Sequence, residues 1–179
     1  MTLLGAVLAG GQSRRFGSDK ALAAWKNHSL IDHVIGTLRP HVDTILICGR
    51  EWNEEITAPD IPEPGRGPLG GLNAAMAYAT CHGLDRVLSV PCDVPTLPDS
   101  LLRRLKACDE PTYLQEHPVI GIWPSALAAT LDRHLAGNIR GSMREWTGLI
   151  AADSARLLEG EQLPNINRTT DLMALGSHG

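Results

Sequence analysis

Residues 3–20 of the chain are Leu3-Leu4-Gly5-Ala6-Val7-Leu8-Ala9, then Gly10-Gly11-Gln12-Ser13-Arg14-Arg15-Phe16-Gly17-Ser18-Asp19-Lys20. A continuous apolar run bounded by glycines is typical of a strand that is buried on both faces, as in a parallel sheet. Glycines directly after such a strand allow a sharp turn and a close approach of the backbone to a ligand. The N–H groups of that turn, flanked by Arg14, Arg15 and Lys20, predict an anion site, and we expect a nucleoside triphosphate there.

Two familiar phosphate loops are excluded by spacing. A Walker loop needs a glycine, four residues and then Gly-Lys-Ser/Thr, and this stretch contains no Gly-Lys pair. The dinucleotide fingerprint Gly-x-Gly-x-x-Gly is also absent, because Gly10 and Gly11 are adjacent. The spacing therefore argues against a Walker-type nucleotide-binding enzyme and against a dinucleotide-binding enzyme.

The same stretch resembles the Leu-Ala-Gly-Gly-x-Ser-x-Arg-Met-Gly-x-Asp-Lys signature of the molybdenum cofactor guanylyltransferases. It departs from that signature by Phe16, where methionine is usual. Related nucleotidyltransferases more often have Ala-Ala-Gly after their first strand, so Ala9-Gly10-Gly11 favours the guanylyl branch. The resemblance implies transfer of GMP from GTP to the terminal phosphate of molybdopterin, with molybdopterin guanine dinucleotide and pyrophosphate as products.

The composition is ordinary for a globular domain. The chain has 179 residues, 43% of them hydrophobic and 20% charged, and residues 1–179 are expected to form a single nucleotidyltransferase domain. The net charge of −4 gives no reason to expect a nucleic acid or a membrane as partner, and no apolar run approaches a membrane span. The four scattered cysteines form no Cys-x-x-Cys pair and indicate reduced thiols in a cytoplasmic protein, which we expect to be a monomer.

Hydrophobic spacing predicts alternating strands and helices after the first strand. In the first half we expect a helix between Ser29 and Arg39, a buried strand over 43–49, at most a short edge strand within 51–66, a helix over 72–79, a buried strand over 85–91 and a helix after Pro98. In the second half we expect one bent strand or two short strands over 112–123, a helix capped by Ser125, and a short helix with Ile139, Met143 and Trp146 on one face. This order predicts an α/β three-layer α/β/α sandwich on a mostly parallel sheet, a Rossmann-like nucleotidyltransferase fold.

Two further features point to the edge where the parallel strands end. The glycine-rich stretch 65–71 leads into a predicted helix and puts bare backbone at a positively polarised helix start, although close helix packing on small residues is an alternative. Asp93 directly follows the strand over 85–91, and ligands of open α/β sheets gather outside the carboxyl ends of strands. Mg²⁺ prefers oxygen ligands and is commonly held by one or two carboxylates plus substrate phosphates. Asp93 is therefore the predicted metal ligand, with a turn or helix-cap aspartate as the alternative.

Other segments extend the resemblance. Gly67-Pro68-Leu69 is similar to the family's Gly-Pro-Leu-Ala-Gly element, and residues 91–95 resemble a Pro-Cys-Asp-x-Pro segment whose aspartate binds magnesium. Ile61-Pro62-Glu63 stands where the family commonly has Ile-Pro-Asp, which implies that Glu63 helps to select guanine; Asp60 is the other carboxylate nearby.

Two segments nearer the C-terminus resemble the family's substrate-binding elements. His117-Pro118 corresponds to a His-Pro segment, and residues 165–167 correspond to an Asn-x-Asn element. The resemblance implies that His117, Asn165 and Asn167 contact the molybdopterin, since asparagine amides offer donors and acceptors that suit a pterin edge. An ordinary strand-end histidine and turn asparagines are the alternatives.

Together these residues define a predicted site. The nucleotide is expected to contact Leu8, Ala9, Gly10, Gly11, Lys20, Glu63, Gly67 and Asp93. Arg15 and Lys20 are expected to offset phosphate charge, and Asp93 to hold Mg²⁺ while the cofactor phosphate attacks the α-phosphorus in line. The implied partners are GTP and molybdopterin, with transient contact to molybdenum cofactor enzymes or chaperones.

Three other functions stay open at this point. One is a related nucleotidyltransferase that uses CTP, or that acts on a sugar phosphate. Another is a nucleotide-binding regulator without catalysis, against which Lys20 and Asp93 argue. The third is a plain structural domain, in which two glycine-rich loops at strand ends would have no purpose.

Overall fold

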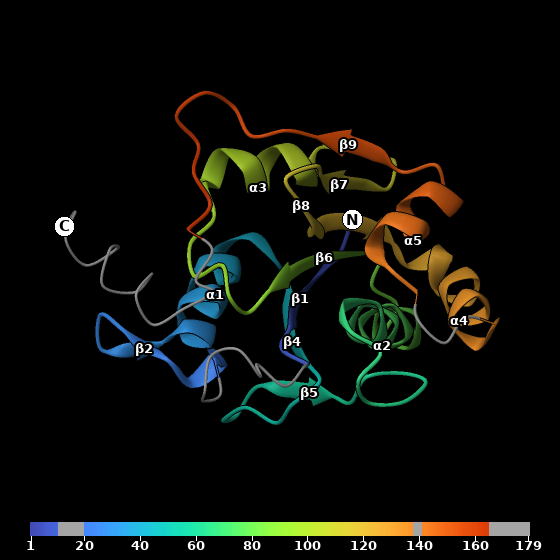
Figure 1. Ribbon diagram of the computed structural model, residues 1–179, viewed down its shortest axis with the longest axis horizontal. Coiled ribbons are helices and arrows are strands. Elements are labelled where there is room, and N and C mark those ends of the chain that lie inside the picture. Colours follow the sequence, from blue (N-terminus) through green and yellow to red (C-terminus); the bar gives the residue numbers. More distant parts are fainter. Residues whose placement is uncertain (11–19, 138–140, 165–179) are drawn as a thin grey trace.

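The computed structural model describes residues 1–10, 20–137 and 141–164 of the chain. They form a seven-stranded sheet with helices on both faces, and a separate two-stranded hairpin (Figure 1). In spatial order the strands of the sheet are β5 (Ile56–Ala58), β4 (Thr44–Cys48), β1 (Leu3–Leu8), β6 (Arg86–Pro91), β8 (His117–Pro124), β7 (Thr112–Leu114) and β9 (Asp153–Ala155). The hairpin consists of β2 (Ala24–Trp25) and β3 (His28–Ser29).

Two helical layers enclose this sheet, each with its own hydrophobic core. The helices of the first layer are α1 (Leu30–Leu38) and α3 (Asp99–Lys106), and those of the second are α2 (Pro68–Cys81), α4 (Ala128–Gly137) and α5 (Met143–Leu149). The connections include the short 3₁₀ helices η1 (Lys20–Leu22), η2 (Arg39–His41) and η3 (Ser125–Leu127). The predicted three-layer α/β/α sandwich is confirmed (Figure 1).

The sheet is mostly parallel, as predicted. Strands β5, β4, β1 and β6 pair in parallel, while β8 is antiparallel to both β6 and β7. Two reversals restore the direction, so β7 again runs the same way as β6. The carboxyl ends of β1, β4, β5, β6 and β7 therefore lie at one edge of the sheet, together with the amino end of β8. We call this the carboxyl edge.

Local sequence explains where the main elements begin and end. Every residue of β1 is buried, which matches its uninterrupted apolar composition. Ser29 caps α1 by accepting a hydrogen bond from the Asp32 N–H at 3.2 Å, and a 3₁₀ turn that contains Pro40 follows that helix. Ser142 and Glu145 form a reciprocal capping box at the start of α5.

Several details differ from the expectations. Ser125 does not cap α4: its hydroxyl donates to the Asp85 carbonyl at 2.9 Å, and η3 precedes the helix. Of the two alternatives expected for 112–123, the two strands are confirmed, and they turn at residues 115–116. The hairpin and β9 were not predicted, because strands of two or three residues are too short to show a period. Met143 and Trp146 are buried on α5 as expected, while Ile139 lies outside the described residues.

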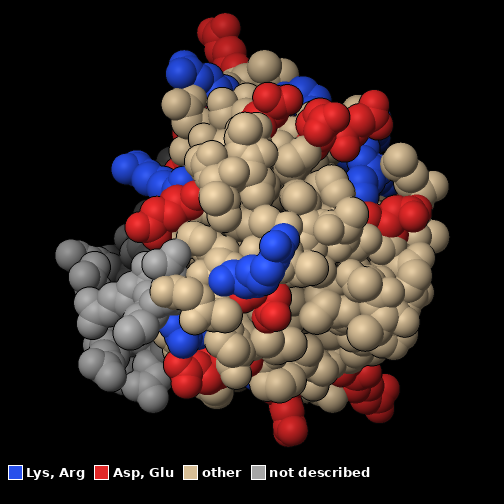
Figure 2. Space-filling view, turned by 90° about the vertical axis from the view of Figure 1, so that its right-hand side faces the viewer, with Lys and Arg blue, Asp and Glu red and all other residues tan. Residues whose placement is uncertain are grey.

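The charge distribution is unremarkable on the face that carries α4 and α5. Acidic and basic side chains are scattered there around a largely uncharged area (Figure 2). Within the described ranges, none of the helices combines the length and the apolar character that crossing a membrane requires.

Candidate active site

The first loop begins between two neighbouring strand ends. The Ala9 N–H donates to the Cys48 carbonyl of β4 at 2.9 Å, and the Cys92 N–H donates to the Leu8 carbonyl of β1 at 3.2 Å. In the parallel register Leu8 is paired with Pro91, so Asp93 follows the strand end next to the loop. The start of the glycine loop and Asp93 are thus brought to the same edge, as the sequence predicted.

Asp93 occupies the turn after β6. It is half-buried, and its Oδ1 atom is shielded from solvent. Helix α3 begins only at Asp99 with Pro98 at its N-cap, so Asp93 does not cap that helix. No group of three metal-ligating side chains occurs in the part of the chain that the structure describes.

The backbones after β1 and β4 touch at two glycines. Gly49 has a φ of +87°, and its N–H donates to the Ala58 carbonyl at 2.8 Å. A Cβ atom at position 49 would lie 2.4 Å from the Gly10 Cα atom and 2.6 Å from the Gly10 nitrogen. Only glycine fits this position. Because Gly49 has no side chain, the backbone of the first loop can pass directly against the end of β4.

Alanine at position 49 is expected to lower the free energy of unfolding by about 2 kcal/mol, because it combines left-handed backbone strain with a clash against backbone atoms. Urea denaturation measures the loss. Gly65→Ala is the matched control, since Gly65 has the same φ of +87° but open space where a Cβ would stand. Its loss should be about 1 kcal/mol, from strain alone. Equal losses in the two variants would contradict a tight contact between Gly49 and Gly10.

A buried carboxylate lies against this glycine contact. Asp60 follows β5 and is 7% exposed. A Cβ on Gly10 would lie 2.7 Å from Asp60 Oδ2, and one on Gly49 would lie 2.9 Å from Asp60 Oδ1. Burial raises the pKa of Asp60, and a hydrogen bond from the Gly65 N–H opposes the shift. Among the described residues, Asp60 Oδ1 has no hydrogen-bond partner.

The same environment affects the thiol at the end of β4. Cys48 is fully buried, and burial together with the nearby Asp60 charge raises its pKa well above the usual range. A thiol held in its neutral form is a poor nucleophile and metal ligand. Cys48 therefore belongs to the apolar wall of the site.

Glu63 lies in a different place from Asp60. Its side chain is 64% exposed and pairs with Arg66, with 3.0 Å between Glu63 Oε1 and Arg66 Nη2. Of the two carboxylates near the predicted base region, Asp60 is the one buried against the start of the first loop. The sequence resemblance alone had favoured Glu63.

The start of α2 shows both features considered for the glycine-rich stretch 65–71: exposed backbone at a helix start and close helix packing on small residues. Gly67 precedes Pro68 with a φ of +67°, and no side chain caps the first amides of the helix. Gly71, by contrast, is required for packing: a Cβ there would lie 3.2 Å from Cys48 Cβ and from Leu8 Cδ2. Gly67 thus provides the turn, and Gly71 brings the helix close to the ends of β1 and β4.

Arg50 is a site residue that sequence reasoning missed. It follows Gly49, is half-buried, and its Nε–H donates to the Ala9 carbonyl at 3.2 Å. A cation is therefore fixed at the first residue of the glycine loop. In the sequence, the feature that could have indicated Arg50 is its position directly after a glycine at a strand end.

His117 is half-buried and is the first residue of β8. Its strand is next to β6 in the sheet, so His117 lies at the carboxyl edge. Lys20 begins η1. The other predicted site residues, Gly11, Arg15, Asn165 and Asn167, lie outside the described residues.

Comparison with known proteins shows the family of the chain. A family model for the MobA-like NTP transferase domain matches residues 5–153. The molybdenum cofactor guanylyltransferase of Rhizobium leguminosarum bv. trifolii (strain WSM2304) is 35% identical over 156 residues, covering 80% of this chain and 74% of that protein.

Solved structures share the fold. Molybdopterin-guanine dinucleotide biosynthesis protein A from Archaeoglobus fulgidus matches with a TM-score of 0.74 at 19% identity, over 96% of this chain and 95% of that one. A manganese complex of Rv0371c from Mycobacterium tuberculosis H37Rv matches with a TM-score of 0.65 at 14% identity, over 100% of both chains. With its strand-end glycine loop and its sequence relatives, the chain belongs to the molybdenum cofactor guanylyltransferases of the MobA-like NTP transferase family.

Proposed function

We propose that this protein transfers GMP from GTP to the terminal phosphate of molybdopterin, forming molybdopterin guanine dinucleotide and pyrophosphate. The observation that carries the proposal is the convergence of three groups on one strand edge: the start of the glycine loop, Asp93 on one side of it and Asp60 on the other. The family and the 35% identical relative support the same reaction.

The triphosphate would lie over the bare backbone at Gly10. Gly49 adds no side chain of its own at this point, and the Arg50 guanidinium at the Ala9 carbonyl adds positive charge beside it. Arg15 and Lys20 are proposed to offset further phosphate charge. An oxygen of the molybdopterin phosphate attacks the α-phosphorus in line. The bond from the α-phosphorus to the bridging oxygen breaks, and pyrophosphate leaves with that electron pair.

The divalent ion proposed for Asp93 is Mg²⁺. The half-buried carboxylate at the strand end suits a hard cation that completes its shell with water and phosphate oxygens. When bound, such an ion neutralises charge on the transferring phosphate and on the leaving group. The role of Asp93 itself is to fix the ion beside the loop.

Asp60 is proposed to select guanine. A carboxylate can accept two hydrogen bonds, from the N1–H and the 2-amino group of guanine, and Asp60 Oδ1 has no partner among the described residues. Burial makes such a charged hydrogen bond strong when the base arrives. For the acceptor, His117, Asn165 and Asn167 remain the proposed molybdopterin contacts.

The nucleotide requirement tests the reaction. Pyrophosphate release should be measured with GTP, ATP, CTP and UTP, in the presence of molybdopterin and Mg²⁺. We expect release with GTP, because the Asp60 carboxylate finds its two donors only on guanine. Preference for CTP without use of GTP would contradict the proposal and favour a cytidylyltransferase.

A further inference from the structure

Glycines surround the buried carboxylate of Asp60 on several sides. Besides Gly10 and Gly49, two glycines of α2 pack against it. A Cβ atom on Gly71 would lie 3.5 Å from Asp60 Oδ1, and one on Gly70 would lie 3.1 Å from Asp60 Cβ. The neighbours of Asp60 at the ends of β1 and β4 and in α2 are therefore bare backbone, and none of these four residues adds a side chain that competes with a ligand for the carboxylate.

Arg66 stands next to Asp60 in this arrangement. The position of a Cβ atom on Gly70 is 2.9 Å from Arg66 Cβ and 3.1 Å from Asp60 Cβ, so both side chains leave the backbone beside the same point of α2. Two backbone contacts fix the loop that joins them. The Ile61 N–H donates to the Gly70 carbonyl at 3.2 Å, and the Gly65 N–H binds the Asp60 carboxylate. The loop 60–67 thus folds back on itself and keeps Asp60 and Arg66 adjacent.

The Arg66 side chain is mostly buried, whereas its acidic partner lies in solvent. The exposed fraction is 17% for the Arg66 side chain and 64% for that of Glu63, with 3.0 Å between Arg66 Nη2 and Glu63 Oε1. A pair with an exposed carboxylate contributes little, because water and salt screen its charge. The guanidinium can therefore exchange Glu63 for a ligand at small cost in free energy, while its buried stem keeps it beside Asp60.

Guanine presents two kinds of hydrogen-bonding groups on one rim. Its N1–H and 2-amino groups donate, and its O6 and N7 atoms accept. A carboxylate matches the two donors, and the planar fork of an arginine matches the two acceptors. Asp60 can read only the donors. A cationic fork held next to Asp60 is the group that the acceptor atoms of the same base require.

We propose that Arg66 is a specificity-determining residue of the nucleotide site, whose guanidinium donates to O6 and N7 of guanine while Asp60 accepts from N1–H and the 2-amino group. This inference rests on the proposed function, since it completes the recognition of the same base. In the free protein Glu63 holds the guanidinium, and guanine takes its place on binding. Arg66 adds discrimination against adenine, whose 6-amino group would place a donor against the guanidinium.

The affinity for 7-deaza-GTP, measured without molybdopterin, tests the inference on the unmodified protein. This nucleotide has a carbon atom in place of N7, so it keeps both donors for Asp60 and loses one acceptor for Arg66. By isothermal titration calorimetry with Mg²⁺ present, we expect its Kd to be about tenfold higher than that of GTP. Equal Kd values in the wild type would overturn the inference, whatever any variant does.

Two substitutions of Arg66 assign the N7 contact. Arg66→Gln should bind GTP about tenfold more weakly than the wild type does, and should bind GTP and 7-deaza-GTP equally, because the group that reads N7 is gone. Arg66→Lys keeps the charge and loses the fork, so it should recover little of the affinity. A preference for GTP over 7-deaza-GTP that persists in Arg66→Gln would assign N7 to another group. Full recovery of GTP affinity in Arg66→Lys would make Arg66 a general phosphate cation, and either result would overturn the inference.

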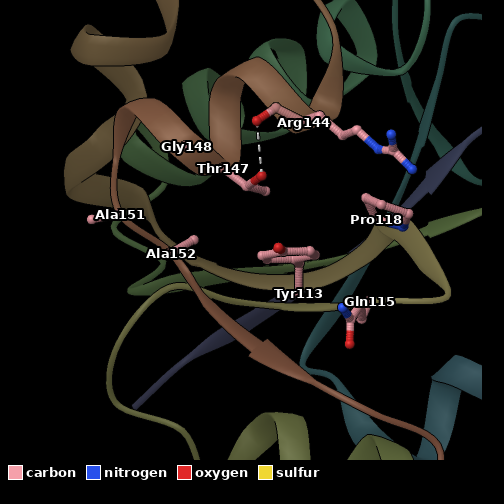
Figure 3. A pocket seen from close by; sticks show the side chains of 8 residues that line it. All are labelled: Tyr113, Gln115, Pro118, Arg144, Thr147, Gly148, Ala151 and Ala152. Carbon is pink, nitrogen blue, oxygen red and sulfur yellow. Dashed lines mark hydrogen bonds between the residues drawn. The ribbon is translucent and has the colours of Figure 1, made fainter.

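Two arginines away from the base serve as controls. Arg103 forms a local ion pair with Asp99, as Arg66 does with Glu63, but its side chain is 75% exposed on α3. Arg144 of α5 lines a separate hollow of about 480 Å³ between that helix and β7 and β8, the half of the sheet opposite to β4 and β5 (Figure 3). Arg103→Gln and Arg144→Gln should leave both Kd values unchanged. A tenfold loss in these controls as well would show a general effect of positive charge and would overturn the inference.

These binding measurements need no transfer, so they separate the inference from the proposed function. A wild type that binds GTP through Arg66 but releases no pyrophosphate with molybdopterin would contradict only the proposed function. A wild type that transfers GMP but binds GTP and 7-deaza-GTP equally would contradict only the role of Arg66.

Discussion

Replacing Asp93 by alanine is expected to reduce the kcat of GMP transfer about a thousandfold, because the proposed Mg²⁺ loses its protein ligand beside the glycine loop. The fold should persist, since Asp93 occupies a turn and caps no helix. Pyrophosphate release under saturating GTP and molybdopterin measures the effect. Raising the Mg²⁺ concentration should restore part of the activity, because weaker metal binding is the expected defect.

Asp99→Ala provides the matched control for this variant. Asp99 is an exposed carboxylate a short distance along the chain, and it pairs with Arg103 at 2.7 Å on the surface of α3. Exposed pairs contribute little to stability, so this variant should keep wild-type activity within about twofold. Activity that survives in Asp93→Ala at limiting Mg²⁺ would show that another group holds the metal.

Replacing Asp60 by asparagine is expected to reduce kcat/KM for GTP by about 10- to 100-fold, which corresponds to one lost hydrogen bond to a charged acceptor. An amide presents a donor where the carboxylate presented a second acceptor, so one of the two guanine contacts becomes repulsive. Inosine triphosphate lacks the 2-amino group and should lose less. Steady-state kinetics with both nucleotides measure the difference.

Glu63→Gln is the control for this prediction. Glu63 is exposed and paired with Arg66, and its loss should leave the selectivity unchanged. The ratio of kcat/KM for GTP to kcat/KM for inosine triphosphate could instead change in Glu63→Gln and not in Asp60→Asn. That result would assign the guanine contact to Glu63. Equal losses with both nucleotides in Asp60→Asn would instead assign Asp60 to support of the loop.

The same Asp60 substitution should stabilise the free protein at neutral pH. Burial raises the pKa of Asp60 in the folded state, so ionisation costs folding free energy as the pH rises above the unfolded value of about 3.9. Asparagine avoids that cost while still accepting the Gly65 N–H. We expect the Tm of Asp60→Asn to exceed that of the wild type by about 3 °C at pH 7.5. The gain should shrink toward pH 4, where the side chain at position 60 is neutral in the folded wild type as well as in the variant. Thermal unfolding across this pH range checks the trend.

The sequence was informative where a single local rule dominates. The apolar run before Gly10 predicted a buried central strand, and the strand at 85–91 placed Asp93 at the same edge, because parallel strands end together. Ser29 and Pro40 bounded α1 through capping and the missing proline N–H. These features depend on neighbours in the chain.

Features that depend on packing between distant segments were not predictable. The contact of Gly49 with Gly10, and the burial of Asp60 against both, join three strand ends that no local pattern connects. Glu63 was predicted from the spacing of a motif and stays a prediction, whereas the burial of Asp60 depends on how β5 ends beside β4.

The most direct test of the account is the identity of the product. The protein should be incubated with molybdopterin, Mg²⁺ and GTP labelled at the α-phosphorus, and the products separated and weighed by mass spectrometry. We predict that the label moves into molybdopterin guanine dinucleotide, with one pyrophosphate released per transfer. Label that stays in GTP, or that enters a product without the pterin, would contradict guanylyl transfer to molybdopterin.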